Sequence, residues 1–457
     1  MNINKQYKGI FWIPGEEKNW KNGLLKFING IAYVEIFGSF DNDPLSVRPK
    51  RRNEICCIHG RLNNSRFCIL NNCQLHISDA FFLTSTINFE FLYFSSNQDL
   101  ITKTTNFEKI EFKLDALRNW VNYNAFEINY EDNKPIGIVR RSEKIENNIL
   151  YSDDNLRLSV NFSSSIPLNH STKDYILEQE TSLILEFNNQ IETNEVFQFV
   201  DKVQDFLILM LGARASLKKQ FLFSDGVNEY IHCYKNSSRF RNNQENKEIY
   251  DVIFSFNDLN DKNNICSFFN TWFSLYNNYE YPIELLIKCL SDISMNYEYK
   301  FINLMYALDV IQQKDVTNSI KDERQISAKN EKLIAKIATK FKDDSNTINE
   351  LRTQLKKNDK IKLKDKLSKL LEPFSNLIES LFEDKFEDFI TIVVNTRNLL
   401  THESSVEPRL KNDEFYYYNL KLEAILLILF LEKLHLPLKD IEIKIKQHGK
   451  FHKVIKD

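Results

Sequence analysis

The feature that most constrains the fold is a change in the spacing of apolar residues about halfway along the 457-residue chain. Up to about Tyr234, short segments alternate apolar and polar residues between polar turns, which is typical of half-buried antiparallel strands. From about Leu259 onward, apolar residues recur every three to four positions, which is the spacing of amphipathic helices. The sequence therefore predicts an α+β multidomain protein, with a β-rich amino-terminal module over residues 1–258 and an all-α helical bundle over residues 259–457.

The expected strands are the segments richest in β-branched and aromatic residues. They are Ala32–Phe37, Phe67–Leu70, Asn88–Phe94, Ile110–Leu114, Arg157–Phe162 and Ser182–Phe187. One helix, Asn194–Leu211, is expected to interrupt them and to end at Gly212, because glycine readily adopts the left-handed conformation that follows many helices.

The helices expected in the bundle follow from the spacing of their apolar residues. They are Cys266–Tyr276, Pro282–Ile293, Tyr297–Gln313, Ala328–Lys342, Ile361–Ile378, Lys385–Thr401 and Glu414–Leu434. The polar segment Asp343–Asp359 is expected to be a loop. Alternation of Ile441, Ile443 and Ile445 predicts a short strand or arm near the carboxy terminus.

Composition excludes several classes of protein. Apolar residues make up 42% of the chain, enough for the cores of two or three domains. The net charge of −3 does not indicate a nucleic-acid binder, so any RNA site must be a local patch. Met1–Tyr7 lacks the features of a signal peptide, and the longest apolar run, Ala424–Leu431, is far shorter than the roughly 20 residues that a bilayer requires. We expect a cytoplasmic protein without membrane contact and with reduced cysteines.

The most informative motif is the segment Arg397–His402, at the end of a predicted amphipathic helix. The apolar stripe of that helix consists of Phe386, Phe389, Ile390, Val393 and Leu400. Arg397 falls on the continuation of the stripe, and an inward-facing arginine either pairs with a carboxylate or is available to an anion. The following residues are poor in helix formers and end at Pro408, so we expect the helix to stop within a turn of His402.

Helical geometry limits how the motif residues meet. Asn398 and His402 are four residues apart and share a face, whereas Arg397 and His402 are five apart and diverge by about 140°. The long arginine side chain, a frayed last turn or a second copy of the helix would bring all three to one phosphate. A two-fold dimer would supply that second copy.

This trio suits cleavage of RNA without a metal or cofactor. A neutral histidine can accept the proton of a ribose 2′-hydroxyl, and an arginine can neutralise the charge that develops on the phosphorus. The products would be a 2′,3′-cyclic phosphate and a 5′-hydroxyl. The alternative is a purely structural role, in which Arg397 forms a salt bridge and His402 is a polar cap at the helix end. The spacing alone is weak, because the eight histidines give roughly one chance match, and a second match, Arg52-Asn53 with His59, runs through a predicted strand.

Other chemistries have less support. Cys56, Cys57, His59, Cys68, Cys73 and His76 contain enough ligands for zinc, but no paired Cys-x-x-Cys accompanies them, and cysteines in apolar strands are usually core residues. The sequence has no Walker loop, dinucleotide fingerprint or H-E-x-x-H motif. Two basic segments, Arg48–Arg52 and Lys356–Lys369, are candidate RNA contacts or simply solvated faces.

The segment Phe389–His402, preceded by predicted helices and followed by one more apolar helix, resembles the HEPN superfamily, whose ribonucleases carry an arginine, a polar residue and a histidine at this spacing. The likeness is closest to the Apea-like HEPN group of bacterial antiphage defence proteins. The segments Gly9–Gly15, Gly23–Phe27, Val34–Gly38 and His59-Gly60 look like the domain that precedes HEPN in ApeA proteins.

The resemblance implies catalytic roles for Arg397 and His402 and a supporting role for Asn398. It implies a metal-independent endoribonuclease that cleaves host RNA, with tRNA the favoured substrate, in abortive infection. The amino-terminal domain would be a sensor or regulator that responds to an unknown phage trigger. One departure is Asp309, which follows Ala307-Leu308 where a glutamate is expected. A catalytically inactive HEPN module that binds nucleic acid or a phage component is the alternative.

A homodimer through the carboxy-terminal helices is also expected. The run Ala424–Leu431 is apolar on every side of two helical turns, so it is either central to the bundle or shared between two copies. A two-fold axis beside the motif would combine two sets of Arg397 and His402 in one cleft.

Overall fold

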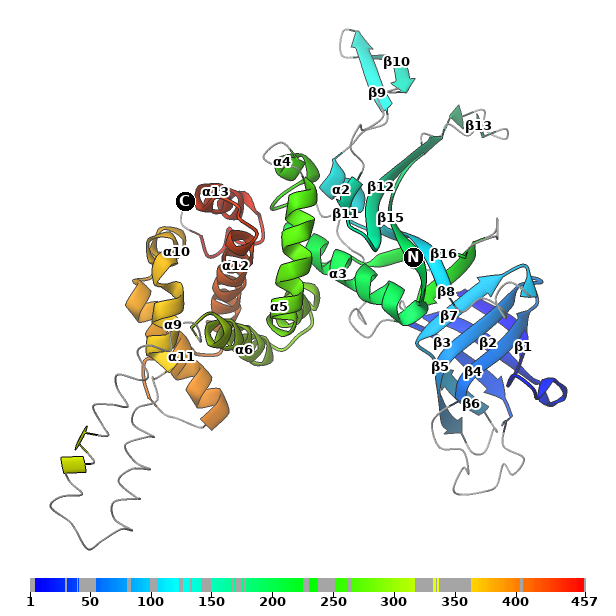
Figure 1. Cartoon of the computed structure of the whole chain (residues 1–457), viewed down its shortest axis with the longest axis horizontal. Coiled ribbons are helices and arrows are strands. Elements are labelled where there is room, and N and C mark those ends of the chain that lie inside the picture. The colour runs from blue at the N-terminus through cyan, green and yellow to red at the C-terminus, as the bar shows by residue number, and fades with distance from the viewer. Residues whose placement is uncertain are drawn as a thin grey trace, which may run out of the picture. The chain divides into compact units, whose positions relative to one another are not determined.

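The computed structural model describes residues 5–28, 31–38, 40, 55–79, 84–98, 106–122, 126–131, 134–140, 149–165, 168–169, 174–175, 178–224, 230–236, 251–260, 265–316, 332–333, 335–336, 363–402 and 406–455. The chain forms two compact units, Met1–Ser274 and Leu275–Asp457. The first is rich in strands and the second is helical (Figure 1), so the predicted fold class is confirmed. The functional division after residue 258 stays a prediction.

Antiparallel strands dominate the first unit. Its main sheet runs in the order β11-β12-β15-β8-β16-β17-β7-β5-β4-β1-β2-β3-β6. The strands are β1 (Lys5–Trp12), β2 (Lys21–Ile28), β3 (Ile31–Phe37), β4 (Ile55–Leu62), β5 (Phe67–Asp79), β6 (Thr84–Asn88), β7 (Phe91–Ser95), β8 (Asn106–Leu114), β11 (Ile149–Ser152), β12 (Leu156–Ser165), β15 (Glu178–Glu192), β16 (Leu217–Phe223) and β17 (Ile231–Lys235). Two small sheets pair β9 (Phe126–Glu131) with β10 (Lys134–Arg140) and β13 (Leu168–Asn169) with β14 (Asp174–Tyr175).

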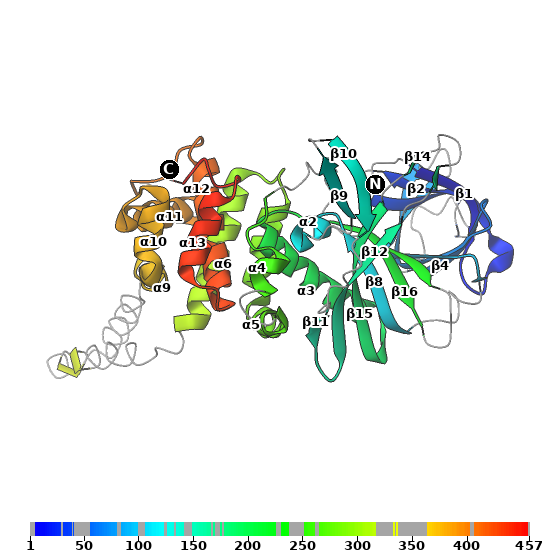
Figure 2. The same ribbon diagram turned by 90° about the horizontal axis from the view of Figure 1, so that it is seen from above.

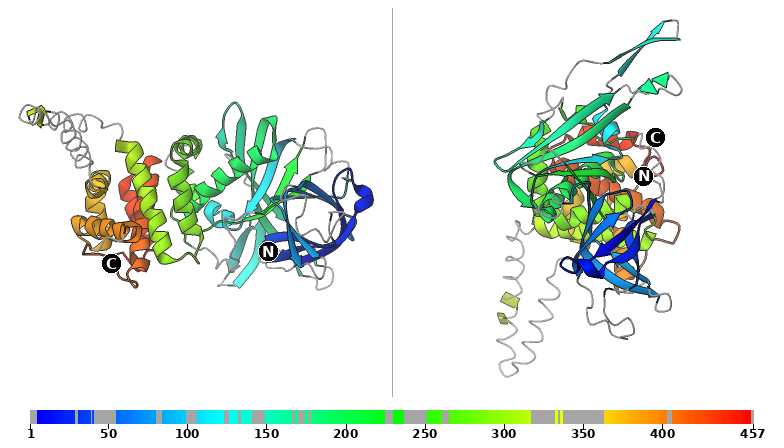
Figure 3. Two further views of the ribbon diagram at one scale, coloured as in Figure 1. Left: turned by 90° about the horizontal axis from the view of Figure 1, so that it is seen from below. Right: turned by 90° about the vertical axis from the view of Figure 1, so that its right-hand side faces the viewer.

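One end of the main sheet closes into a barrel. Strand β6 pairs with β3 on one side and with β5 on the other, so β5-β4-β1-β2-β3-β6 form a ring (Figure 3, blue strands). Phe11 and Cys68 belong to the buried cluster of the barrel, and Gly60 lies between them. A Cβ atom on Gly60 would lie 2.7 Å from the Phe11 ring and 2.8 Å from the Cys68 sulfur. Glycine is therefore required for this close packing.

Helix α3 (Thr193–Leu211) confirms the helix expected over Asn194–Leu211. It packs against β8 and β15. Gly212 follows it in the left-handed conformation, with φ 61°, in agreement with the predicted stop. The short helices α2 (Leu117–Val121) and α4 (Phe256–Asn260) and the 3-10 turn η1 (Glu17–Asn19) were not predicted. Five residues or fewer are too short to show a helical period.

The helical unit contains α6 (Tyr297–Val316), α9 (Leu363–Leu371), the 3-10 turn η4 (Glu372–Phe374), α10 (Ser375–Phe382), α11 (Phe386–His402), α12 (Phe415–Lys433) and α13 (Leu438–Gln447). The predicted helix Ile361–Ile378 is divided by η4, because Pro373 starts a new turn there. Of the predicted helix Ala328–Lys342, only residues 332–333 and 335–336 are described, and they are helical. The predicted loop Asp343–Asp359 lies outside the described residues.

Element α5 (Ile265–Ser291) contains both helices predicted over Cys266–Tyr276 and Pro282–Ile293, because Tyr279 between them is not helical, with φ −128° and ψ 29°. A kink at Tyr279 separates its halves. Pro282 has no N–H to donate to the carbonyl of Asn278, and the Lys314 ammonium group donates to that carbonyl instead. A lysine of α6 thus stabilises the kink.

The carboxy-terminal strand or arm that we expected is wrong, because residues Leu438–Gln447 form helix α13. Ile441 and Ile445 are buried, whereas Ile443 is 43% exposed. Positions four apart share a face in a helix and also in a strand, so the spacing of Ile441 and Ile445 does not separate the two structures.

The apolar run Ala424–Leu431 is buried within the single chain. It belongs to α12, which packs against α6 and α13 (Figure 2). The run is therefore central to the bundle, the first of the two predicted explanations, and the homodimer stays a prediction. None of the helices in the described part of the chain is long and apolar enough to cross a membrane.

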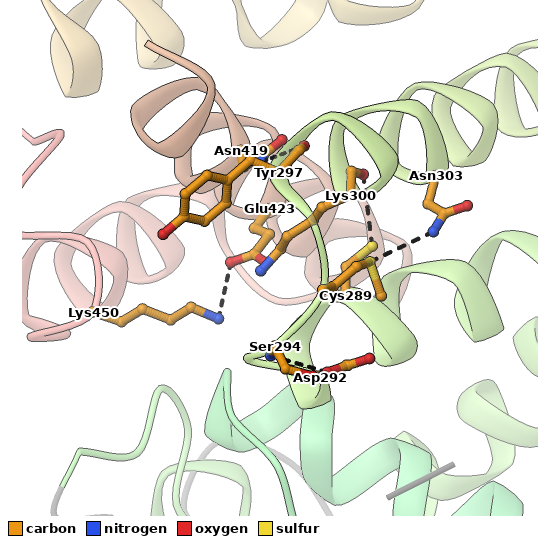
Figure 4. Close-up of polar contacts among 10 residues, drawn as sticks. Cys289, Asp292, Ser294, Tyr297, Lys300, Asn303, Asn419, Glu423 and Lys450 are labelled. Carbon is orange, nitrogen blue, oxygen red and sulfur yellow. Dashed lines mark hydrogen bonds and ion pairs between the residues drawn. The ribbon is translucent and has the colours of Figure 1, made fainter. Parts of the chain in front are cut away.

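A buried charge cluster joins α6, α12 and the carboxy-terminal segment (Figure 4). The Glu423 carboxylate is fully buried and lies 2.5 Å from Lys300 Nζ and 2.9 Å from Lys450 Nζ. Burial alone would raise the pKa of Glu423, but Lys450 and Lys300 outweigh it and lower that pKa below its usual range. Burial lowers the pKa of Lys450, which Glu423 partly offsets.

Candidate active site on helix α11

Helix α11 carries the candidate motif, and its sequence explains its position. Phe389, Ile390 and Val393 are buried, and the helix packs against α6, α9 and α10. The Phe386 N–H donates to Glu379 Oε1 at 2.8 Å, which satisfies one of the free donors at the helix start. The helix includes His402, and residues 403–405, where we expected it to stop, lie outside the described residues. Leu400, expected on the buried stripe, is only half-buried.

The structure brings the three predicted site residues together within one chain. The Arg397 guanidinium donates from Nη1 to Asn398 Oδ1 at 3.2 Å, and the same nitrogen lies 3.4 Å from His402 Nε2. Arg397 and Asn398 are half-buried, whereas His402 is exposed. Of the three routes that geometry allowed, the long arginine side chain is the one observed, so a second copy is not needed for the residues to meet.

The electrostatics of the trio suit an anionic ligand. Among the described residues, no carboxylate forms an ion pair with Arg397, so the salt bridge considered as an alternative is not seen there. Arginine can only donate. In the tautomer of His402 that carries its proton on Nδ1, Nε2 can accept from the guanidinium, which lies 3.4 Å away. A fixed cation and a proton acceptor stand side by side at an exposed helix end.

Two polar side chains that precede the motif form hydrogen bonds to the backbone at Pro408 and Leu410, and the sequence analysis predicted neither contact. Asn395 Nδ2 donates to the Pro408 carbonyl at 3.0 Å. The hydroxyl of Thr396, which is fully buried, accepts from the Leu410 N–H at 2.9 Å. A buried polar residue within an apolar helix face is the signal that indicates such a tether.

The proposed zinc ligands do not converge where the structure describes them. Cys68 lies in the barrel core, and burial raises the pKa of its thiol to about 12. Ile58 points into the same core, so its neighbours Cys57 and His59 point to the opposite face of β4. No group of three or more potential ligands is found among the described residues, and the side chains of Cys56 and His76 lie outside them.

The remaining sequence candidates are only partly visible. The basic segment Arg48–Arg52 and the Arg52-Asn53 part of the second motif match lie outside the described residues, while His59 is on strand β4, as predicted. The basic segment Lys356–Lys369 is described from Leu363 onward, in α9, where Lys364 lies 3.9 Å from Glu387. Asp309 is half-buried on α6.

A β-rich unit followed by a helical bundle, with arginine, asparagine and histidine gathered at the end of a bundle helix, defines a two-domain protein of the HEPN class. The family of the ApeA N-terminal domain 1 matches residues 6–272, and the Apea-like HEPN family matches residues 302–440, which include the motif. The chain therefore belongs to the ApeA family, with a carboxy-terminal Apea-like HEPN domain. No curated protein and no solved structure matches the chain.

Family membership supports a nuclease-type protein of antiphage defence, as the sequence resemblance predicted. HEPN domains are generally ribonucleases, and they typically act on RNA and dimerise. Activity does not follow from the fold alone, because some HEPN domains are inactive. The chemistry of Arg397, Asn398 and His402 therefore has to be argued from their geometry.

Proposed function

We propose that this protein is a metal-independent endoribonuclease in which Arg397 and His402 are catalytic and Asn398 supports them. The observation that carries the proposal is the position of Arg397 Nη1, within 3.4 Å of His402 Nε2 and 3.2 Å of Asn398 Oδ1, at an exposed helix end. Such a trio offers a cation for a phosphate and a base for a hydroxyl, separated by one hydrogen-bond length.

In the proposed reaction, the 2′-hydroxyl of the substrate gives its proton to His402 and its oxygen attacks the adjacent phosphorus. The bond from phosphorus to the 5′-oxygen breaks, and that oxygen takes a proton from water and leaves as a 5′-hydroxyl, while His402 returns to water the proton it accepted. Arg397 stabilises the negative charge on the phosphoryl oxygens. Asn398 accepts a hydrogen bond from Arg397 and holds the guanidinium in place.

The biological role in the proposal is abortive infection. Host RNA, with tRNA favoured, is the substrate, and its cleavage in the cytoplasm halts growth. The amino-terminal module, residues 1–258, senses a phage trigger or regulates the nuclease in response to it, because a unit of this size exceeds what substrate docking requires. The HEPN helices form the homodimer.

Phage challenge of bacteria that produce the protein tests the proposal. Arg397→Ala and His402→Ala are expected to abolish both protection and RNA cleavage while the protein still accumulates in folded form. His452→Ala, which removes an exposed histidine far along the sequence from the motif, is the matched control and should protect normally. Full protection by both motif variants would favour the catalytically inactive interaction module.

A further inference from the structure

Two backbone groups within residues 406–411 are hydrogen-bonded to side chains of α11. Residues Pro408 and Leu410 are the two tether points: Asn395 binds the carbonyl of the first and Thr396 the N–H of the second. Arg409 lies between them, so its backbone position is set from both sides. Because Asn395 and Thr396 directly precede Arg397, the same stretch of helix positions both arginines.

An open pocket lies along this segment. Its volume is about 560 Å³. Its lining residues are Leu399, Glu407, Arg409, Leu410, Lys411, Asn412 and Asp413. Leu399 is the residue that α11 contributes, which places the pocket against the motif helix itself.

The pocket borders the face of α11 that carries His402. Asn395 and His402 are seven residues apart, about 20° from alignment on a helix. Leu399, three residues before His402, is about 60° from it. An RNA strand with its reacting ribose at His402 would therefore have the pocket beside it.

Arg409 has a partner that a phosphate can replace. Its Nε lies 2.9 Å from Glu407 Oε1, and the two side chains are 34% and 66% exposed. An ion pair this exposed contributes little, because water screens it. A phosphodiester offers the guanidinium two oxygens for a bidentate pair, so it can take the place of the exposed Glu407 carboxylate.

We propose that residues 406–411 form a phosphate-binding subsite for the RNA next to the scissile bond, in which Arg409 exchanges Glu407 for a phosphodiester. Asn395 and Thr396 are positioning residues that hold Arg409 there. Lys411, which lines the same pocket and is exposed, adds a second cation. This inference rests on the proposed function, because it requires RNA to be the ligand of α11.

Binding of RNA by the full chain tests the subsite without cleavage. The His402→Ala protein is titrated into a fluorescently labelled single-stranded RNA of about 20 nucleotides at several salt concentrations. Adding Arg409→Ala should weaken binding about fivefold to tenfold and reduce the slope of log Kd against log salt by about 0.7, the value for one phosphate contact on a single strand. Arg409→Lys should give an intermediate loss, because the charge remains but the bidentate fork does not.

Two further variants serve as controls. Arg118→Ala removes an exposed arginine from α2 and should change the dissociation constant less than twofold. Glu407→Gln removes the competing carboxylate and should tighten binding about twofold to threefold. Equal losses in Arg118→Ala and Arg409→Ala would attribute the effect to general charge and overturn the subsite.

Two substitutions of Thr396 form a matched pair that separates its role in positioning Arg409 from its role in protein stability. Thr396→Ser keeps the hydroxyl that accepts from Leu410 and should preserve the salt dependence. Thr396→Val has nearly the same shape but no acceptor, so it should reduce the slope as Arg409→Ala does. Thermal unfolding of both variants identifies a loss that arises from misfolding. An unchanged salt slope in folded Thr396→Val would refute the positioning role.

The outcomes distinguish this inference from the proposed function. If the wild-type chain cleaves RNA but Arg409→Ala changes neither binding nor KM, the subsite is wrong and the nuclease stands. If RNA binding depends on Arg409 but the wild-type chain cleaves nothing, the subsite stands and the nuclease assignment is wrong. Absence of any RNA binding by His402→Ala would overturn the subsite.

Discussion

The HEPN bundle contains two clusters of polar side chains, one around Glu423 and one around Arg397, that differ in their access to water and in whether their charges are paired. Glu423 is completely buried between Lys300 and Lys450, so each charge there already has a protein partner. Among the described residues, the Arg397 guanidinium contacts the side chains of Asn398 and His402 and forms no ion pair with a carboxylate.

The comparison shows which cluster is available to a ligand. Burying a carboxylate requires compensation by nearby cations, and the Glu423 cluster provides it within the fold. The Arg397 guanidinium receives no such compensation from the described residues, so its charge is available to an external anion. The first cluster should therefore respond to mutation through stability, and the second through catalysis.

The largest expected effect is on the rate of RNA cleavage by the purified protein. Arg397→Ala and His402→Ala should each reduce the rate about a thousandfold, because each removes a group that acts on the transition state. The double variant should be little worse than either single variant, since the two groups act together. The Arg397→Ala and His402→Ala proteins should each melt within a few degrees of the wild type. A large loss of stability in either single variant would show that the Arg397 cluster contributes to stability and not only to catalysis.

The next effect is on stability. Glu423→Ala should lower the free energy of unfolding by about 3–5 kcal/mol, because it leaves two lysines without their shared partner. Glu442→Ala is the matched control: its ion pair with Lys446, at 2.7 Å, is partly exposed, and its loss should cost under about 1 kcal/mol. Chemical denaturation measures both. Equal losses of unfolding free energy in the two variants would show that burial of Glu423 does not increase its contribution to stability.

A smaller effect should distinguish the supporting residue from the catalytic ones. Asn398→Ala removes one hydrogen bond to Arg397, worth about 1 to 1.5 kcal/mol, so kcat should fall roughly tenfold. Single-turnover kinetics on a defined RNA measure the change. A loss as large as that of Arg397→Ala would give Asn398 a direct part in the chemistry.

The smallest effect should appear as a pH dependence of stability. The pKa of Glu423 is lowered in the folded state, with burial raising it and the two lysines outweighing burial. Its contribution is therefore present above the unfolded pKa of about 4.3 and is lost as the pH falls through the lower folded value. Unfolding of Glu423→Gln should vary less with pH below about 4.3 than unfolding of the wild type. Identical profiles would contradict the assigned direction.

The sequence was sufficient to predict a helix where its apolar residues keep one spacing over many residues. Helices α3 and α11 and the glycine stop at Gly212 all follow from local patterns. Periodicity could not identify α13, because Ile441 and Ile445 share a face in either kind of structure. It also could not identify helices as short as α2.

The partners of the two charge clusters were less accessible to prediction. Glu423 interrupts an apolar helix, but its lysines come from distant positions, so only the tertiary fold brings them together. The contact of Arg397 with His402 was predictable as one of three routes, because the two lie on one helix. The tethers from Asn395 and Thr396 required the path of the following segment, which no local pattern specifies.

The most direct test of the central claim is the chemistry of the RNA ends. Purified protein is incubated with total RNA in the presence of EDTA, and the new termini are mapped, with His402→Ala as the control. We predict cleavage that survives the chelator and leaves 2′,3′-cyclic phosphate and 5′-hydroxyl ends in the wild type only. Cleavage that requires a divalent ion, or that leaves 5′-phosphates, would contradict a reaction driven by Arg397 and His402.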